Sequence, residues 1–339
     1  MSEQTGLPRG RAWLYAAAAL CTSLALSIPA AEFILRLSGR YPWTYSKQDA
    51  GEPTVHQPDP VLGWRNKPGK YAMPAYAPEG APWSLTLTHR GARATGLDPR
   101  DELPRLLVVG CSFTLGWGVS DSETYAWSLQ TRLPSFSVLN YGTGGYGTYQ
   151  SLLLLERLLR TSAPPSMVLY GFIEHHEDRN VATDIWMETL AEYSKRAHVF
   201  VPYVTLGPGA NLLRHAPERY APWLWADRFA LVNAFEQVQA RLMTRGRRAT
   251  KREVTERLFS SMDELCRARH TRLIVTLLAL TDGAKRDYLD YCRNRNIECI
   301  DCSHPLTPEM LVPGDNHPNP KMHEIWAECI ARAVGGSQR

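Results

Sequence analysis

Apolar residues are grouped along this chain in ways that predict a long N-terminal helix followed by alternating strands and helices. Residues 12–31 are twenty consecutive positions without a formally charged side chain. At about 1.5 Å per residue, such a helix spans roughly 30 Å, which is the thickness of the hydrocarbon core of a bilayer. The pattern therefore predicts a transmembrane helix that attaches the protein to a membrane.

A cleaved signal peptide is the alternative for this segment, because small residues are frequent in residues 27–31. A retained anchor is favoured because apolar residues resume directly afterwards, in residues 32–37 (EFILRL). Arg9 and Arg11 precede the apolar run. Since Arg and Lys are enriched on the cytoplasmic side of membrane helices, we expect a cytoplasmic N-terminus and an extracytoplasmic main part, on the periplasmic or cell-surface side.

Beyond residue 104, short apolar runs alternate with stretches of helical periodicity. The apolar runs predict buried parallel strands over residues 105–110, 135–140, 166–172 and 272–280. The intervening stretches predict helices over residues 148–160, 251–269 and 282–295. This alternation is typical of an α/β domain, a three-layer sandwich in which helices cover both faces of a parallel sheet.

The same patterns divide the chain into segments. Residues 1–35 are the N-terminal tip and the anchor. Residues 36–104 are rich in Pro, Gly, Trp and Tyr and predict a stalk and an irregular extension, with one strand at residues 84–88 (SLTLT). Residues 105–335 form the α/β domain. Residues 181–248 fit the alternation poorly and predict an insertion into this domain rather than a separate domain.

Composition excludes several classes of protein. The 38 Lys and Arg residues nearly balance the 34 Asp and Glu residues, giving a formal net charge of +4. No strongly basic stripe is present, so we expect no nucleic-acid partner. With 44% hydrophobic residues and Gly and Pro spread along the chain, the composition is that of a globular protein.

Cysteines fit an oxidising compartment without indicating a metal. The chain has seven, and those in its last part are the candidates for a disulfide, with several possible connectivities. Cys299 and Cys302 form a CxxC pair, but neither a second CxxC nor a matching His pair accompanies it. We therefore expect no zinc site.

Three loops carry residues that could do chemistry: residues 110–119, 140–150 and 314–318. The loops at the carboxyl ends of parallel strands meet in one crevice, so these residues can come together in space. Ser112 directly follows the first predicted strand and precedes a predicted helical turn. There its hydroxyl is exposed beside free backbone N–H groups, which suits a nucleophile.

The last loop contains an Asp and a His with useful spacing. Pro318 favours an extended conformation for His317, and in an extended segment positions i and i+2 face the same side. Asp315 can therefore reach the imidazole of His317, fix its tautomer and support the imidazolium form. Asn319 and Pro320 then begin a closing helix.

The middle loop contains a dinucleotide-like pattern, because Gly142, Gly144 and Gly147 match GxGxxG. A dinucleotide fold would need an acidic residue about 20 positions later, and Glu174 comes too late for this role. A strand with a serine loop already precedes the motif, and an extracytoplasmic domain meets little NAD. We therefore expect no cofactor and instead expect the N–H of Gly142 to face a developing negative charge.

Together the three loops resemble the sequence blocks of the SGNH or GDSL-like hydrolases, over about residues 105–334. The residues that carry this resemblance are Gly110, Cys111, Ser112, Phe113, Thr114, Gly116, Gly118 and Val119; Asn140, Gly142, Gly145, Gly147, Thr148 and Gln150; and Asp315, His317, Pro318 and Asn319. The upstream DPVLGWRNKPG and the single anchor resemble membrane-tethered members. An α/β-hydrolase is disfavoured because its GxSxG motif needs glycine at Thr114.

The resemblance implies a flavodoxin-like fold, Ser112 as nucleophile and Asp315 with His317 completing a triad. It further implies an oxyanion hole made by the N–H groups of Ser112 and Gly142. The chain departs from the family in two places. One is Cys111, where Asp is usual. The other is the family's third block, which usually supplies an Asn side chain and corresponds here to residues 173–180 (IEHHEDRN), after the strand predicted at residues 166–172.

In that third block His175 takes the place of the Asn, or His176 does if the alignment shifts by one residue. A neutral imidazole N–H can also donate to an oxyanion. The EHHED cluster could instead suggest a metal. However, adjacent residues after a strand face opposite ways, so we expect no metal site there.

The sequence thus predicts an extracytoplasmic serine esterase that hydrolyses O-acyl esters, O-acetyl foremost. Trp186, Trp223 and Trp225 suggest a carbohydrate or cell-envelope substrate, because aromatic faces stack on sugar rings. An acyltransferase with the same triad is the second hypothesis, in which a sugar hydroxyl replaces water. A non-catalytic envelope scaffold or glycan-binding protein is the third, supported by the altered third block.

Overall fold

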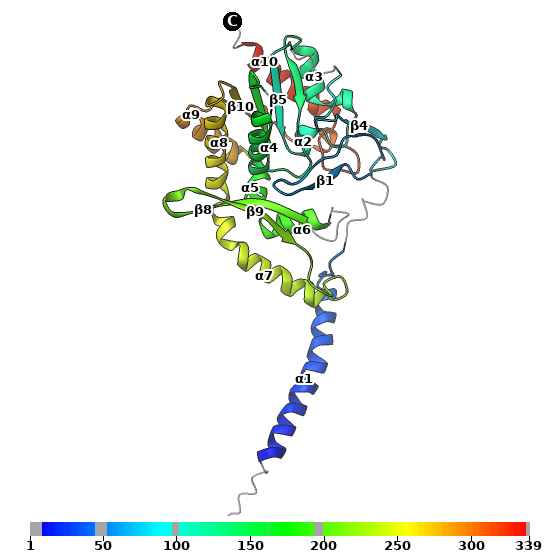
Figure 1. Ribbon diagram of the computed structural model, residues 1–339. Coiled ribbons are helices and arrows are strands. Elements are labelled where there is room, and N and C mark those ends of the chain that lie inside the picture. The colour runs from blue at the N-terminus through cyan, green and yellow to red at the C-terminus, as the bar shows by residue number, and fades with distance from the viewer. Residues whose placement is uncertain (1–8, 45–52, 97–101, 162, 193–198, 337–339) are drawn as a thin grey trace, which may run out of the picture. The chain divides into compact units, whose positions relative to one another are not determined.

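The computed structural model describes residues 9–44, 53–96, 102–161, 163–192 and 199–336 (Figure 1). The chain divides into two compact units. Unit 1 comprises Met1–Tyr45 and Ala221–Met243, and unit 2 comprises Ser46–Tyr220 and Thr244–Arg339.

Unit 2 is built on a parallel sheet of five strands. In chain order these are β5 (Arg105–Gly110), β6 (Ser137–Asn140), β7 (Met167–Ile173), β10 (Arg272–Ala279) and β11 (Cys299–Asp301). Their spatial order is β11-β10-β7-β5-β6, and all neighbouring pairs are parallel. Counted along the chain this is the order 2-1-3-4-5 of flavodoxin-like doubly wound sheets. The predicted α/β fold class with a parallel sheet is confirmed.

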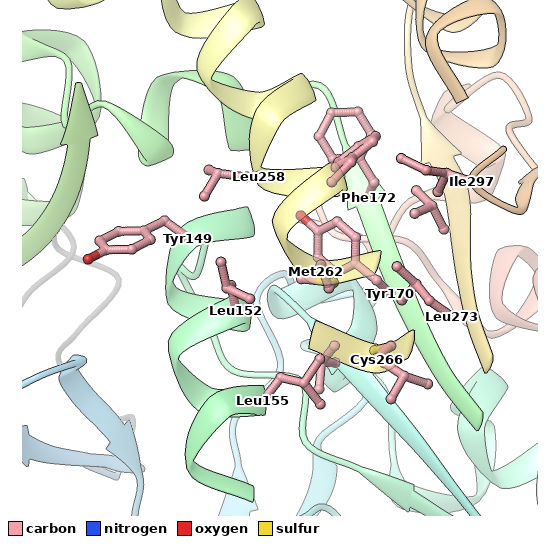
Figure 2. Close-up of a cluster of buried hydrophobic side chains, with 14 of the residues drawn as sticks. Tyr149, Leu152, Leu155, Tyr170, Phe172, Leu258, Met262, Cys266, Leu273 and Ile297 are labelled. Atoms are coloured by element: carbon pink, nitrogen blue, oxygen red, sulfur yellow. The ribbon is translucent and has the colours of Figure 1, made fainter. Parts of the chain in front are cut away.

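Helices cover both faces of this sheet. Successive strand residues point to opposite sides, so the apolar strands give the sheet two apolar faces that must be buried. On one face Val109, Tyr170 and Val275 belong to a buried cluster with residues of α4 (Thr148–Thr161), α8 (Lys251–Arg267) and α9 (Asp282–Arg295). Figure 2 shows this cluster, with Leu152 and Leu155 of α4 opposite Leu258, Met262 and Cys266 of α8.

On the other face, the alternate strand residues Val108, Leu169 and Ile274 belong to a second buried cluster. It includes side chains of α3 (Tyr125–Arg132) and α10 (Pro320–Gly336), with Trp326 of α10 fully buried. The two clusters on either side of one sheet form the expected three layers.

The extension before the sheet is more regular than the sequence predicts. It forms two antiparallel hairpins, one from β1 (His56–Asp59) and β2 (Gly63–Asn66), the other from β3 (Gly69–Met73) and β4 (Trp83–Leu87). Only β4 has the alternating pattern that was recognised as a strand. The other three are short and interrupted by Pro, Gly and charged residues, so their pairing depends on tertiary contacts.

Asp59 closes the turn between β1 and β2. Its carboxylate accepts backbone N–H groups of Val61 (3.0 Å) and Leu62 (2.9 Å) and both terminal nitrogens of Arg157 on α4, at 2.7 and 2.9 Å. Burial alone would raise the pKa of Asp59, but these hydrogen bonds outweigh it and lower the pKa to about 2. The hairpin is thereby held against α4.

We expect Asp59→Asn to lower the free energy of unfolding by about 2 kcal/mol at neutral pH, because hydrogen bonds to a charged group are lost. A carboxyl whose pKa is lowered by folding stabilises the fold above its unfolded-state pKa of about 4. This contribution disappears as the pH falls toward the folded-state value of about 2. Urea unfolding of both proteins across this range tests the prediction, and a stability difference independent of pH would contradict it.

The segment predicted as an insertion, residues 181–248, and the residues next to it form several elements. They are α5 (His176–Asn180), α6 (Asp184–Glu192), an antiparallel hairpin of β8 (Val199–Leu206) and β9 (Leu212–Tyr220), and α7 (Ala230–Ala249). The remaining short elements of unit 2 are α2 (Ser112–Leu115) and the 3-10 turns Asp121–Glu123, Pro208–Ala210 and Pro308–Met310.

Unit 1 contains α1 (Arg9–Leu37), which agrees with the predicted apolar helix. Its segment Trp13–Leu37 is 25 residues long with a mean hydropathy of 1.7, and none of its most apolar window is buried. Within the described residues this is the one helix long and apolar enough to cross a membrane. A membrane anchor and a signal sequence both have these properties.

A disulfide joins Cys302, directly after β11, to Cys329 of α10. The pairing lies among the late cysteines, where the sequence suggested one. It connects the end of the sheet to the helix that follows the Asp/His loop.

Candidate active site

Ser112 is placed by a tight turn at the end of β5. Gly110 has a φ of +156°, and a Cβ atom there would lie 2.3 Å from the Thr114 hydroxyl and 2.9 Å from the carbonyl oxygen of Gly171. Only glycine fits this close approach. Ser112 is therefore the first residue of α2, where its own N–H has no acceptor within the helix.

The structure brings Ser112, His317 and Asp315 into one chain of hydrogen bonds. His317 Nε2 lies 2.9 Å from Ser112 Oγ, although 205 positions separate the two residues. On the other side of the ring, His317 Nδ1 lies 2.9 Å from Asp315 Oδ1. These are the three residues predicted as a triad, and their arrangement is that of nucleophile, base and orienting carboxylate.

The loop that carries Asp315 and His317 is fixed by its own backbone. The Val312 N–H donates to the His317 carbonyl (2.8 Å), and the Asp315 N–H donates to the Val312 carbonyl (3.0 Å). Asn319 accepts the Met322 N–H at the start of α10 (3.2 Å). The His–Asp spacing of two residues is thus stabilised by the loop and by the helix that follows.

The charge on Asp315 suits its position behind the ring. Burial would raise the pKa of this carboxyl, but hydrogen bonds from His317 and from the N–H groups of Asn316 and His317 lower it below its ordinary value. A carboxylate at this position favours the tautomer with the proton on Nδ1. Nε2 is then left to accept the Ser112 proton.

Aromatic side chains from the serine loop flank the His317 ring. Phe113 meets it edge to face at 5.7 Å between centroids, and Trp117 is tilted against it at 6.4 Å. Trp117 in turn contacts Trp83 (5.4 Å) and stacks on His56 (6.4 Å). An aromatic surface therefore lies directly beside the triad.

Gly142 has a different role from the one expected. Its N–H donates to Asn140 Oδ1 (2.9 Å), so it does not point at a free site, and Asn140 Nδ2 donates to the Thr114 carbonyl (2.9 Å). A Cβ atom at Gly142 would lie 2.3 Å from the Leu115 nitrogen. Glycine is needed here for close packing of the loop against α2, and Asn140 ties the two together.

Two other glycines of this loop retain free donors. The N–H groups of Gly144 and Gly145 have no acceptor within the described residues. Gly144 lies against the His56 ring, and Gly145 has a φ of +79° beside Trp64. Unlike the N–H of Gly142, these two N–H groups are therefore available to a ligand.

The extension before the sheet contacts the loop after β6 and the loop that carries Asp315 and His317. Asn66 Nδ2 donates to the Gly142 carbonyl (3.0 Å), and Trp64 Nε1 donates to the Gly144 carbonyl (2.8 Å). At the third loop, a Cβ on Gly314 would lie 2.5 Å from the Tyr76 carbonyl oxygen. The extension is therefore part of the framework of the site.

His175 and His176 do not join the triad in this structure. His176 is fully buried, and its Nδ1 lies 2.6 Å from the Tyr170 hydroxyl, while its ring contacts Phe172. Burial lowers the pKa of His176, which keeps the ring neutral in the core. His175 is exposed just before α5. Within the described residues, neither ring contacts Ser112 or His317.

Arg93 is a residue of the site that sequence reasoning missed. It is fully buried, and its Nε donates to Asp121 (2.8 Å). Its terminal nitrogens donate to the carbonyls of Leu115 at the end of α2, of Gly116 and Val119 in the loop that follows, and of Ser84 in β4. Burial lowers the pKa of Arg93, and the Asp121 carboxylate opposes this effect. Arg93 thus fixes the loop that carries Phe113 and Trp117.

Within the part of the chain that the structure describes, no three His, Cys, Asp or Glu side chains are arranged to hold a metal ion. The EHHED cluster is instead divided between the core and the surface, with the Glu177 carboxylate bonded to the Tyr288 hydroxyl (2.8 Å).

Comparison with known proteins gives distant structural likenesses. No family model matches the chain, and no curated protein matches it. A GDSL-like lipase from Bacteroides thetaiotaomicron is similar, with 15% identity, a TM-score of 0.39, and coverage of 71% of this chain and 92% of that chain. A lipolytic protein of the G-D-S-L family from Veillonella parvula has 11% identity, a TM-score of 0.41, and coverage of 69% and 99%.

A psychrotrophic esterase from Pseudoalteromonas has 9% identity and a TM-score of 0.41, with coverage of 69% of this chain and 98% of that chain. Two of the three descriptions name the G-D-S-L family, which the sequence blocks also resemble. Likenesses at these identities and TM-scores assign no activity to this chain.

Proposed function

We propose that the chain is an ester-bond hydrolase of the SGNH type, a serine esterase with Ser112 as its nucleophile. The observation that carries this proposal is the hydrogen-bonded chain from Ser112 Oγ through His317 to Asp315, with 2.9 Å at each step. It is located at the carboxyl edge of a doubly wound sheet, where such folds bind their ligands.

The geometry supports a two-step acyl transfer to water. Ser112 Oγ attacks the acyl carbonyl while His317 Nε2 takes its proton, and Asp315 stabilises the resulting imidazolium. His317 then returns the proton to the departing alkoxide, which leaves an acyl group on Ser112. Water, deprotonated by the same nitrogen, attacks this acyl-enzyme and releases the acid and free Ser112.

The oxyanion formed in each step needs preorganised donors. The Ser112 N–H at the start of α2 is the first of them, and an N–H of Gly144 or Gly145 is the second. This assignment replaces Gly142, whose N–H is bound to Asn140. It also dispenses with an imidazole donor from His175 or His176.

The aromatic surface beside the triad supports an O-acylated carbohydrate or cell-envelope substrate, O-acetyl foremost. Trp117 and His56 present stacked rings next to His317. Such faces pack against the C–H groups of a sugar ring. Trp186 belongs to unit 2 and lies over the Arg179 guanidinium, whereas Trp223 and Trp225 belong to unit 1 with α1.

We place the active domain outside the cytoplasm, attached by α1. The apolar segment Trp13–Leu37 supports the attachment, and Arg9 and Arg11 before it support a cytoplasmic N-terminus. The disulfide between Cys302 and Cys329 supports an oxidising compartment.

A fluorophosphonate probe tests the proposal directly, because it forms an adduct with an activated serine. We expect the full-length protein to be labelled and Ser112→Ala to remain unlabelled. Ser128→Ala is the matched control, since the Ser128 hydroxyl donates to Glu324 on the outer helices and lies outside the triad. Absence of labelling in the wild type would favour a non-catalytic scaffold.

A further inference from the structure

Unit 1 exposes a large apolar surface next to the end of α1. It comprises the residues of the loop before α7 and of the first part of that helix, and we call it the apolar platform. Its exposed apolar side chains include Trp223, Leu224, Trp225, Phe235, Val238 and Leu242.

The first part of α7 exposes its apolar face and buries polar side chains, whereas an amphipathic helix of a soluble protein does the reverse. Phe235, Val238 and Leu242 are spaced i, i+3 and i+7, so they share one face, and that face is exposed. The polar Asn233 and Glu236 are buried instead. A soluble protein rarely leaves such a face uncovered, so the platform requires an apolar partner.

The buried polar side chains explain why the apolar face points outward. Asn233 Nδ2 donates to the Tyr41 carbonyl (3.0 Å), and Glu236 accepts the Trp223 N–H (3.0 Å). Both bonds are made within unit 1, between α7 and the segments next to it. These hydrogen bonds therefore fix the rotation of the helix about its axis, and they hold its apolar face toward the outside.

Hydrogen bonds join the segment that carries the platform to α1 at Glu32 and Arg36. The Glu32 carboxylate accepts the N–H groups of Ala230 (3.0 Å) and Leu231 (2.8 Å), which caps the start of α7. Arg36 donates to the Arg228 carbonyl (2.9 Å). Figure 1 shows the start of α7 beside the end of α1.

Glu32 lies at the height along α1 where the hydrocarbon core of a bilayer is expected to end. From Trp13, where the candidate span begins, α1 rises to Glu32 by roughly 29 Å at about 1.5 Å per residue. The hydrocarbon core of a bilayer is about 30 Å thick. If α1 crosses the membrane, Glu32 lies where hydrocarbon gives way to headgroups, and the residues bonded to it lie there too.

The side chains at this level suit a lipid interface. Trp and Tyr favour the boundary between hydrocarbon and headgroups, as do amphipathic helices lying in the membrane plane. Trp223, Trp225 and Tyr41 are exposed, and so are Arg36 and Arg228, whose guanidinium groups can pair with lipid phosphates. Trp, Leu and Phe together with Arg fit a phospholipid surface better than a sugar.

We propose that the apolar platform is a second membrane contact, which inserts into the headgroup region of the outer leaflet beside α1. This proposal rests on the membrane anchor proposed above and is independent of the catalytic assignment. The protein would then be held by a transmembrane helix and by a shallow interfacial surface, of which Trp223 and Trp225 are part.

Site-specific fluorescence on the full-length protein tests this. We would place it in nanodiscs of phosphatidylethanolamine and phosphatidylglycerol and attach an environment-sensitive dye to one cysteine at a time. Leu224→Cys and Leu242→Cys, each combined with Cys21→Ser, report on the platform. If one of these two variants does not fold, Val238→Cys with Cys21→Ser is used in its place. Native Cys21, which is exposed on α1, is the control deep in the membrane, and Asp290→Cys on α9, with Cys21→Ser, is the water-exposed control. All of these proteins also carry Cys299→Ser, because Cys299 is a free and partly exposed thiol.

We expect emission from positions 224 and 242 to be shifted to the blue relative to position 290. It should be quenched most by lipids with a nitroxide near the headgroup, whereas a dye on Cys21 is quenched most by a nitroxide near the end of the acyl chain. Water-like emission at both platform sites overturns the proposal. So does blue-shifted emission that no spin-labelled lipid quenches, which would show that a protein, such as a second copy, covers the platform. A dye on Cys21 that is not quenched would overturn the anchor and the platform together, whatever the esterase activity.

Discussion

Replacing Ser112 with alanine is expected to lower kcat for ester hydrolysis by about 10^4-fold or more, because the covalent route is lost and only binding and oxyanion donors remain. The variant should keep its fold. The one side-chain hydrogen bond of Ser112 in the described chain is to His317, so the free energy of unfolding should change by less than about 1 kcal/mol. Hydrolysis of p-nitrophenyl acetate by the full-length protein, with thermal unfolding, measures both quantities.

Ser128→Ala is again the matched control, and it should retain wild-type kcat. A Ser112→Ala variant that hydrolyses the ester within tenfold of the wild-type rate would contradict the assignment of the nucleophile. Cys111 is fully buried on the sheet side of the turn and belongs to the apolar cluster beneath α3 and α10. We therefore expect no residual activity from its thiol.

The second large effect is expected for Asp315→Asn, which should lower kcat by about 10^4-fold. The amide keeps the size of the side chain, but its N–H can face Nδ1 and stabilise the tautomer that carries the proton on Nε2. That tautomer cannot accept the Ser112 proton. Asp290→Asn, at an exposed ion pair on α9, is the control and should leave kcat unchanged.

The pH dependence of this variant follows from the environment of Asp315. Its pKa is lowered by the hydrogen bonds it accepts, so the carboxylate is ionised throughout the neutral and weakly acidic range. The loss in Asp315→Asn should therefore be equal at about pH 8 and about pH 9, both above the ordinary pKa values of a carboxyl group, about 4, and of an imidazole, about 6.5. Recovery of activity at either pH would show that Asp315 does not act as the orienting charge.

The sheet was predictable because its strands are nearly continuous apolar runs. Residues 105–110 and 282–295 were predicted with the bounds observed for β5 and α9. The strand β11 has three residues, too short to give a pattern, and α3 (YAWSLQTR) is too polar for its buried face to be recognised. In the extension, the short strands pair through contacts that local sequence does not encode.

The contact of Ser112 with His317 and of His317 with Asp315 was predictable for a related reason. The turn after β5 and the spacing of Asp315 and His317 are local features, and the parallel sheet brings the two loops to one edge. What could not be predicted depends on contacts between loops. Asn140 occupies the N–H of Gly142, and Arg93, an arginine in an irregular segment, is buried behind the serine loop. No local signal indicates either.

The two histidines of the third block illustrate the same limit. Their sequence neighbours determine that one faces the core and the other the solvent, but not which one. The structure buries His176 against Tyr170 and exposes His175. Likewise, the periodicity of α7 identifies an amphipathic helix, while the hydrogen bonds of Asn233 and Glu236 decide which side is covered.

The disulfide between Cys302 and Cys329 has a practical consequence for producing the protein. It fastens the last strand to α10, whose first turn is capped by Asn319, two residues after His317. Chain made in a reducing cytosol would keep these two thiols free and leave the histidine loop on a looser support. We therefore expect export to an oxidising compartment during expression to raise the fraction of purified protein that is active in the proposed ester hydrolysis.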